Sequence, residues 1–377
     1  MASGRSGLTA EQRALCLAAR TRLSDDARAC LGRLVRAGLD WERLWELAHV
    51  HEVGPLVGAN VSSVGGDLVP AAWRERALRR RHVTLRANAH LADTLGDVLD
   101  ALDVADVEAM PVKGLVLAET LYGDIAARPC ADLDVLVRTR DLERAREALR
   151  GIGFVQRATP GYKALVHQFH DPAWERVTGN QHVRLELHWA LWADSERRLG
   201  TDGLWARATT ATVAGRTVRT MAPEDVLLHL AIHRTRSALR LRWVVDVAEL
   251  VQRHGATLDW AAFLGRADEA GARTASWAVL ALARDLLDAP VPDTVMQQLA
   301  VSWPKRTILD RTCGTTALFR PTADGNVAQQ PHLAYRAFEE DGIGRIAMLL
   351  ARSAVRPIRE GLHDAGVVRA RRTVPGS

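Results

Sequence analysis

The chain has 377 residues, of which 47% are hydrophobic and 25% are charged, as in an ordinary globular protein with room for two or three subdomains. No apolar run reaches the roughly 18 residues that a membrane helix needs, and the start of the chain lacks the apolar stretch of a secretory signal. The net charge of +5 and the pI of about 9.4 fit a polyanionic ligand such as a nucleoside triphosphate, and they permit RNA.

The four cysteines are scattered without a C-x-x-C pair, a pattern that is typical of reduced thiols and gives no indication of a zinc site. Together with the missing signal, this usage predicts a cytoplasmic protein with no membrane partner.

Residues 1–105 are predicted to form an N-terminal helical region. Ser24 followed by two aspartates marks one helix start, and Asp40 marks another. The stretch over residues 55–69 is rich in Gly, Pro and Ser and is predicted to be a connection between helices. A long helix is predicted to follow over residues 70–102.

The first half of that long helix is strongly basic. Its arginines are Arg74, Arg76, Arg79, Arg80, Arg81 and Arg86. One interpretation is a solvated helix surface, and the other is an electrostatic track for phosphate groups or an RNA acceptor. No aromatic residues interleave with these arginines, so the pattern does not support stacking on single-stranded nucleic acid.

Residues 106–221 are predicted to form an α/β core that begins with a strand, a tight turn, a helix, a loop and a second strand. The second strand carries Asp132 and Asp134, whose side chains point to the same face roughly 7 Å apart. Two carboxylates at the start of an apolar strand repel each other unless a cation lies between them. Oxygen ligands of this kind favour Mg²⁺.

The turn between the first strand and the helix is Lys113–Gly114. Glycine allows a tight turn, and the helix start that follows offers free N–H groups to a phosphate. Only three of the 50 basic residues are lysines, which makes a lysine at this turn informative. Arg128, in the loop before the carboxylates, is expected to clamp phosphate oxygens.

A further strand is predicted from His182 onward, because apolar and polar residues alternate along it. Arg184, Glu186 and His188 lie on its polar face. If this strand neighbours the aspartate strand, Glu186 supplies a third carboxylate to the same site. The alternative is an edge strand whose polar face is solvated.

Residues 222–355 are predicted to form an all-helical C-terminal region. His229 and His233 are spaced i, i+4 and therefore lie on one helix face. They are interpreted either as contacts to the base or the acceptor, or as structural hydrogen-bonding groups. Residues 356–377 form a basic tail that is predicted to be disordered.

These motifs occur in a recognisable order: Lys-Gly, a helix ending in Leu-Tyr, Arg128, and then Asp-x-Asp-x-Leu-Val. The order resembles the bacterial nucleotidyltransferase-like family of the DNA polymerase β-type superfamily, over roughly residues 100–260. The resemblance implies an α+β fold with a small mixed β-sheet, flanked by N-terminal helices and an all-helical C-terminal region. It also implies that Glu186 is the third carboxylate, since the family has an acidic residue followed by x-His-Trp at this point.

The functional expectation that follows from the resemblance is a magnesium-dependent nucleotidyltransferase. It would move a nucleoside monophosphate from an NTP, expected to be ATP, to an acceptor hydroxyl on a small molecule, peptide or sugar. Two Mg²⁺ ions would bind to Asp132, Asp134 and Glu186. Residues expected to contact the nucleotide or acceptor are Lys113, Gly114, Arg128, His188, His229 and His233.

Three alternatives stay open on the sequence alone. The chain could encode an RNA- or tRNA-directed nucleotidyltransferase or toxin that uses the arginine-rich helix. It could also encode a phosphotransferase that uses the same carboxylates, or a nucleotide-binding protein without catalytic activity.

Overall fold

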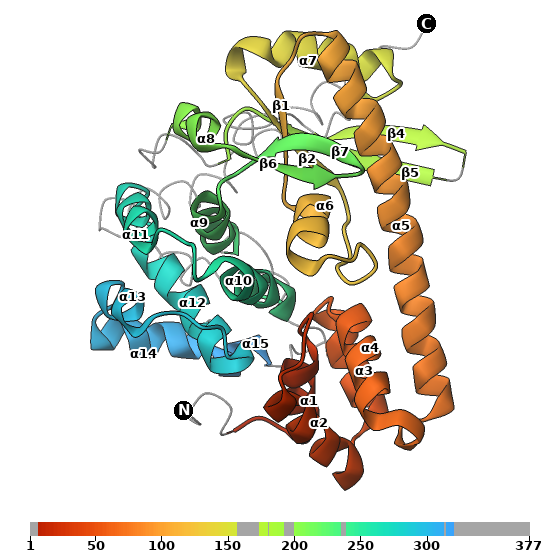
Figure 1. The fold of residues 1–377 in the computed structure, drawn as a ribbon, viewed down its shortest axis with the longest axis vertical. Coiled ribbons are helices and arrows are strands. Elements are labelled where there is room, and N and C mark those ends of the chain that lie inside the picture. The colour runs from red at the N-terminus through yellow and green to blue at the C-terminus, as the bar shows by residue number, and fades with distance from the viewer. Residues whose placement is uncertain are drawn as a thin grey trace, which may run out of the picture.

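The computed structural model describes residues 7–156, 173–179, 181–191, 200–234, 239–312 and 314–319. Figure 1 shows helices surrounding a mixed five-stranded sheet, which confirms the predicted α+β fold. The predicted basic tail over residues 356–377 lies outside the described residues.

The N-terminal elements are helices α1 (Ala10–Ala18), α2 (Asp25–Ala37), α3 (Trp41–Val50), α4 (Gly54–Gly65), the 3-10 turn η1 (Gly66–Leu68) and helix α5 (Ala71–Val104). The five-stranded sheet contains β1 (Ala109–Val112), β2 (Leu133–Val137), β3 (Val155–Gln156), β4 (Trp174–Thr178) and β5 (Gln181–His188). Between these strands lie α6 (Gly114–Leu117), the π-helical turn η2 (Ala118–Tyr122), the 3-10 turn η3 (Thr139–Asp141) and α7 (Leu142–Gly151).

A short helix and a hairpin follow the sheet: α8 (Thr201–Arg207), β6 (Thr209–Val213) and β7 (Arg216–Thr220). The C-terminal helices are α9 (Pro223–Arg234), α10 (Leu241–His254), α11 (Trp260–Glu269), α12 (Arg273–Leu287), α13 (Asp293–Gln298), α14 (Trp303–Thr312) and α15 (Thr315–Leu318).

Side-chain caps begin the N-terminal helices where the sequence predicts. The Ser24 hydroxyl accepts a hydrogen bond from the Ala27 N–H, and the Asp40 carboxylate accepts one from the Arg43 N–H. Each cap satisfies a backbone donor that the first turn of a helix leaves without an intrahelical partner.

The strand order of the main sheet is β1-β2-β5-β4-β3. β2 and β5 are parallel, and the other neighbouring pairs are antiparallel. The register of the parallel pair places Asp134 opposite Glu186. β5 is therefore a central strand beside the aspartate strand, which excludes the edge-strand interpretation.

The two faces of the sheet carry different side chains. Leu133 and Val135 of β2 and Leu185 of β5 pack with Leu95 and Val98 of α5 in one buried apolar cluster. Side chains alternate between the faces of a strand, so the intervening polar residues of β2 and β5 face away from α5. A charged site on that second face is separated from the α5 side by a layer of apolar residues.

Residues 55–69 correct one sequence prediction, because most of this stretch is helix α4 and not a connection. Pro55 occupies the first turn, where proline is tolerated, and Leu56, Val57 and Val61 are buried. A Cβ added at Gly58 would lie 2.7 Å from the Cβ of Ala77 on α5. The glycine therefore permits close packing of two helices, and it does not mark a loop.

Helices from both ends of the chain share one hydrophobic cluster. Leu31 of α2 and Leu44 of α3 belong to it together with Val245 of α10 and Leu280 of α12. Figure 1 shows α5 running from the N-terminal helices past the sheet toward α7. The predicted boundaries at residues 105, 221 and 355 stay predictions: the cluster contains residues from both sides of the first two, and residue 355 lies outside the described residues. Among the described residues, no helix has the length and apolar character to cross a membrane.

Candidate active site

Asp134 lies at the centre of a group of charged side chains on the second face of the sheet. The Nζ atom of Lys113 donates to its Oδ1 atom over 2.9 Å, and Nε2 of His188 lies 2.8 Å from the same oxygen. The side chain of Asp134 is 6% exposed. Burial alone would raise the pKa of Asp134, but Lys113 and His188 hold it well below its ordinary value. The carboxylate is therefore ionised over the physiological range.

Lys113 reaches Asp134 from an unusual turn. The backbone φ angles of Lys113 and Gly114 are 55° and 27°, values that L side chains rarely adopt. A Cβ at Gly114 would also lie 3.4 Å from the carbonyl oxygen of Asp132. Burial disfavours the charged lysine, but the carboxylates of Asp134, Glu186 and Asp132 raise its pKa above the ordinary value. The turn thus presents a charged ammonium group beside the aspartates.

Glu186 and His188 complete a compact set of donor atoms with Asp134. One ligand atom of each residue lies within 4.8 Å of the others. The period-two alternation of β5 places Glu186 and His188 on one face, and the parallel register brings them beside Asp134. Carboxylate oxygens are the ligands that Mg²⁺ prefers, and imidazole is a ligand for several divalent transition metals. The chemistry of this donor set therefore fits a divalent cation.

Asp132 is half-buried immediately before β2 and stands outside that compact set. Burial, followed by the negative charges of Asp134 and Glu186, raises the pKa of Asp132 to about 6. The charges of Asp134 and Glu186 act on Asp132, so the three predicted acidic residues form one group of interacting carboxylates. A divalent cation bound among these carboxylates would reduce the repulsion between their negative charges. The ligand role of each acid stays a prediction.

Arg128 has a different environment from the one expected. Its Nε and Nη2 atoms donate to the two carboxylate oxygens of Asp246 over 2.7 and 2.8 Å, and its side chain is 3% exposed. Its Nη1 atom donates to the carbonyl oxygen of Gly114 over 3.3 Å. The guanidinium is therefore buried against Asp246 and contacts the Lys113–Gly114 turn, and its contact with phosphate oxygens stays a prediction.

Two residues have a positioning role that was not predicted from the sequence. Asp246 on α10 accepts a hydrogen bond from the Tyr122 hydroxyl over 2.6 Å in addition to those from Arg128. Asn88 on α5 donates to the carbonyl oxygens of Ile125 and Arg128 and accepts from the N–H of Cys130. Asn88 therefore fixes the loop that leads into Asp132. Its place among the apolar positions of α5 that face the sheet was the signal that could have identified it.

The two candidate histidines of α9 lie near the site. His229 is 3% exposed, and burial together with the positive charge of Lys113 lowers its pKa well below the ordinary value. Its imidazole is therefore neutral at physiological pH. The rings of His229 and His233 are stacked with centroids 5.6 Å apart, and His233 meets Trp243 edge-on at 5.0 Å. Contact of either histidine with the base or the acceptor stays a prediction.

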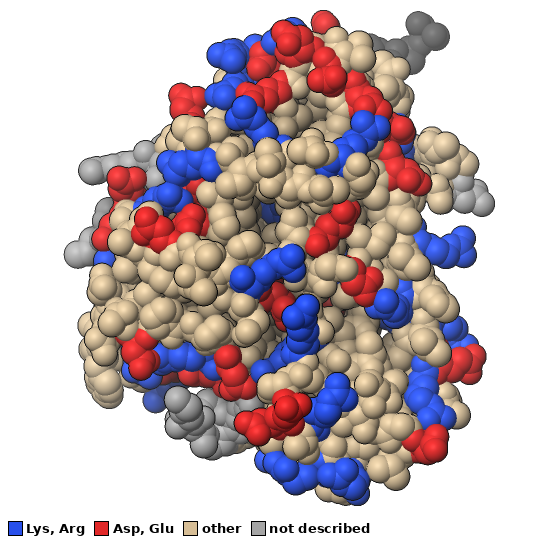
Figure 2. Space-filling view, viewed as in Figure 1, with Lys and Arg blue, Asp and Glu red and all other residues tan. Residues whose placement is uncertain are grey.

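The basic half of α5 is largely neutralised. Four of its six arginines form ion pairs with acids, namely Arg74 with Asp67, Arg76 with Glu42, Arg79 with Glu75 and Arg81 with Asp124. Figure 2 shows basic and acidic side chains intermingled on the face that it displays. This arrangement favours the solvated-surface interpretation over a continuous track for RNA.

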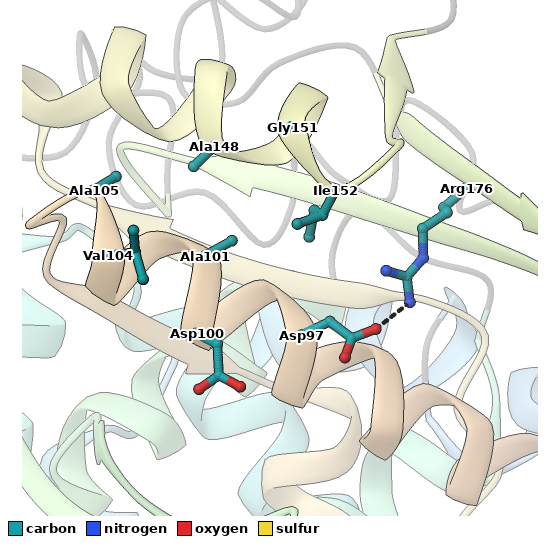
Figure 3. A pocket seen from close by; sticks show the side chains of 9 residues that line it. All are labelled: Asp97, Asp100, Ala101, Val104, Ala105, Ala148, Gly151, Ile152 and Arg176. Carbon is teal, nitrogen blue, oxygen red and sulfur yellow. Dashed lines mark hydrogen bonds and ion pairs between the residues drawn. The ribbon is translucent and has the colours of Figure 1, made fainter.

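A pocket with a volume of about 560 Å³ lies between α5 and α7. Figure 3 shows Ala101 of α5 and Ile152 beyond α7 at this pocket, and an ion pair of 2.8 Å between Asp97 and Arg176 beside them. α5 covers the apolar face of the sheet, whereas the charged group around Asp134 occupies the other face. We therefore exclude this pocket from the candidate site.

One of three comparisons with known proteins identifies the family of this chain. No curated protein matches the chain. A crystal structure of an antigenic nucleotidyltransferase-like protein from Paracoccidioides brasiliensis is similar over 58% of this chain and 95% of that chain, with 16% identity and a TM-score of 0.33, from which we draw no conclusion. The family model described as uncharacterised nucleotidyltransferase matches residues 37–288, a span that contains the Lys113 turn, both aspartates and Glu186. The chain therefore belongs to this uncharacterised nucleotidyltransferase family.

Proposed function

We propose that the protein transfers a nucleoside monophosphate from ATP to the hydroxyl of a small acceptor in a magnesium-dependent reaction that releases pyrophosphate. The observation that carries this proposal is the compact set of Asp134, Glu186 and His188 beside the ammonium group of Lys113. Phosphoryl-group chemistry of this kind depends on charge neutralisation and positioning more than on covalent catalysis. A buried anionic set facing a cationic turn supports that chemistry.

The acidic residues have distinct parts in the proposal. Asp134 and Glu186, with Asp132 beside them, would hold two Mg²⁺ ions, which neutralise the charge on the attacking and leaving oxygens when bound. His188 donates from Nε2 to Asp134, and this hydrogen bond fixes the orientation of the carboxylate. Asp132 lies directly before β2, where the strand meets the Lys113–Gly114 turn, and this position supports its part in the proposal.

In this scheme the Lys113–Gly114 turn binds the triphosphate, and Arg128 supports the turn. Lys113 would release Asp134 and pair with the β and γ phosphate oxygens once the carboxylates are neutralised. The backbone of Gly114 would lie against the same phosphates, and Arg128 would hold the turn through the carbonyl of Gly114. Glu186 would accept the proton of the attacking hydroxyl. Its ion pair with Arg184, at 2.8 Å, would hold its carboxylate in place.

The test is a transfer assay with each of the four NTPs, labelled separately at the α and γ phosphates, with Mg²⁺ and a mixture of small hydroxyl-bearing metabolites. Transfer of the α label is expected, and Asp134→Asn is expected to lower the rate by about 10²-fold or more. Asp103→Asn, which changes an exposed acid on α5, serves as the matched control. Binding of Mn²⁺ to both variants, followed by electron paramagnetic resonance, reports on the metal site separately from activity.

The assay separates the remaining alternatives. Transfer of the γ label would indicate a phosphotransferase, and tight ATP binding without transfer would indicate a non-catalytic nucleotide-binding protein. Either result, or equal rates for Asp134→Asn and the unaltered protein, would reject the proposal. Transfer that requires RNA would reassign the acceptor to the RNA-directed class.

A further inference from the structure

A second pocket, with a volume of about 270 Å³, lies where α5 passes the residues that precede Asp132. Arg86 and His90, one helical turn apart on α5, line one side of it. Ala131 lines it from the loop, and Gln181 and His182 line it from the start of β5. The pocket therefore touches three elements, two of which continue into the candidate active site.

The pocket lies at the start of β5, where one of its lining residues, His182, belongs to the polar face of the strand. His182, Arg184 and Glu186 alternate along that strand, so their side chains share one face. At a rise of about 3.3 Å per residue, His182 is about 13 Å from Glu186 along the strand. Ala131 is joined directly to Asp132. A small molecule with one end in the pocket could therefore present its other end to the acidic residues.

The pocket and the Lys113–Gly114 turn lie on opposite sides of the aspartate strand. The turn directly follows β1, the pocket is lined by β5, and β2 lies between these two strands in the sheet. A triphosphate bound at the turn would leave the pocket free. This position suits the acceptor better than it suits the nucleotide.

Arg86 supplies the charge of the pocket. Among the six arginines of the basic half of α5, Arg80 and Arg86 have no carboxylate partner within the described part of the chain, and of these two only Arg86 lines this pocket. His182 pairs with Glu175 at 3.2 Å, so Arg86, His90 and the amide of Gln181 are the other lining side chains that can donate hydrogen bonds. The volume is just below the range of about 300–1,000 Å³ typical of drug-sized ligands, so the site suits a small group.

We propose that this pocket binds the phosphate or carboxylate group of a small acceptor, with the guanidinium of Arg86 as its main contact and His90 as a second donor. The proposal rests on the proposed function for its acceptor, and it deepens that function by naming the acceptor as an anionic small molecule. A planar guanidinium matches both oxyanions through paired hydrogen bonds, so both belong to the same chemical class.

The test measures binding by isothermal titration calorimetry at low salt. Ribose 5-phosphate is compared with ribose, and gluconate with glucose, so that the two pairs distinguish phosphate from carboxylate. At least one anion is expected to bind about tenfold more tightly than its uncharged counterpart, and Arg86→Ala is expected to abolish that difference. Arg86→Lys is expected to retain part of it. Arg79→Ala is the matched control, because Arg79 is an exposed arginine of the same helix that pairs with Glu75.

The outcomes are distinguishable from a failure of the proposed function. Binding of ATP with Mg²⁺ is measured in parallel and is expected to be the same in the unaltered protein, Arg86→Ala and Arg79→Ala. If none of these three proteins binds ATP with Mg²⁺, the proposed function is rejected. If Arg86→Ala does not weaken anion binding, the pocket proposal is rejected. An RNA oligonucleotide whose affinity falls equally in both variants would also overturn it, in favour of a basic helix surface.

Discussion

At the scale of single residues, the ionised form of Asp132 is electrostatically unfavourable in the folded site. Burial and the neighbouring charges of Asp134 and Glu186 raise the pKa of this carboxyl from 3.8 to about 6. The folded state therefore binds a proton more readily than the unfolded chain does between about pH 4 and pH 6. In that window the free energy of unfolding falls as the pH rises, and above it the ionised Asp132 destabilises the fold.

The corresponding prediction is that Asp132→Asn stabilises the metal-free protein at pH 7.5. A shift of about two pKa units sets the scale, so the gain is on the order of 1–3 kcal/mol, and it is expected to be close to zero near pH 4. Urea denaturation in the presence of EDTA at both pH values measures it. Asp103→Asn is the control for loss of an exposed carboxylate. A variant that is less stable than the unaltered protein at pH 7.5 would contradict the proposed repulsion.

At the scale of secondary-structure elements, local patterns predicted some features and missed others. The alternation along residues 182–188 predicted which side chains of β5 share a face, because the side-chain period of a strand is fixed at two. The parallel register that brings Glu186 beside Asp134 needed the sheet itself. α4 was missed because glycine and serine lower helix propensity locally, whereas the helix is stabilised by packing that the sequence pattern does not display.

Gly58 and Gly265 give a matched test of that packing. Both glycines lie within helices, but a Cβ at Gly58 would meet the Ala77 Cβ at 2.7 Å, whereas a Cβ at Gly265 on α11 would meet nothing within 4 Å. Gly58→Ala is expected to lower the free energy of unfolding by about 1–3 kcal/mol through overpacking. Gly265→Ala is expected to raise it by up to about 1 kcal/mol through helix propensity. Chemical denaturation compares the two variants, and stabilisation by both would show that α4 does not pack closely on α5.

At the scale of the whole molecule, long-range contacts connect the C-terminal helices to the active-site turn. Arg128 and Asp246 are 118 residues apart in sequence, yet their side chains form a buried pair, and Arg242 on the same helix donates to the carbonyl of Pro129. At the start of α10, the ring Nδ1 atom of His51 accepts a hydrogen bond from the N–H of Leu241. No local pattern specifies such partners, and this is why the buried pairing of Arg128 with Asp246 could not be predicted from the sequence.

The buried pair predicts a large effect of removing one partner. Asp246→Asn leaves the guanidinium of Arg128 buried without a full counter-charge, so the free energy of unfolding is expected to fall by about 3–5 kcal/mol. Arg81→Ala removes an ion pair of similar length whose side chains are each 37% exposed, and it is expected to cost less than about 1 kcal/mol.

A double variant separates the charge from its packing. Arg128→Met combined with Asp246→Leu removes both charges and keeps apolar volume, so it is expected to recover a large part of the stability that Asp246→Asn loses. Guanidinium denaturation of all four proteins at pH 7.5 measures the series. If the double variant recovers stability but binds ATP more weakly than the unaltered protein, Arg128 contributes to nucleotide binding, through its Nη1 hydrogen bond to Gly114 or through the predicted contact with phosphate oxygens. If Asp246→Asn costs no more than Arg81→Ala, the C-terminal helices do not hold the turn through this pair.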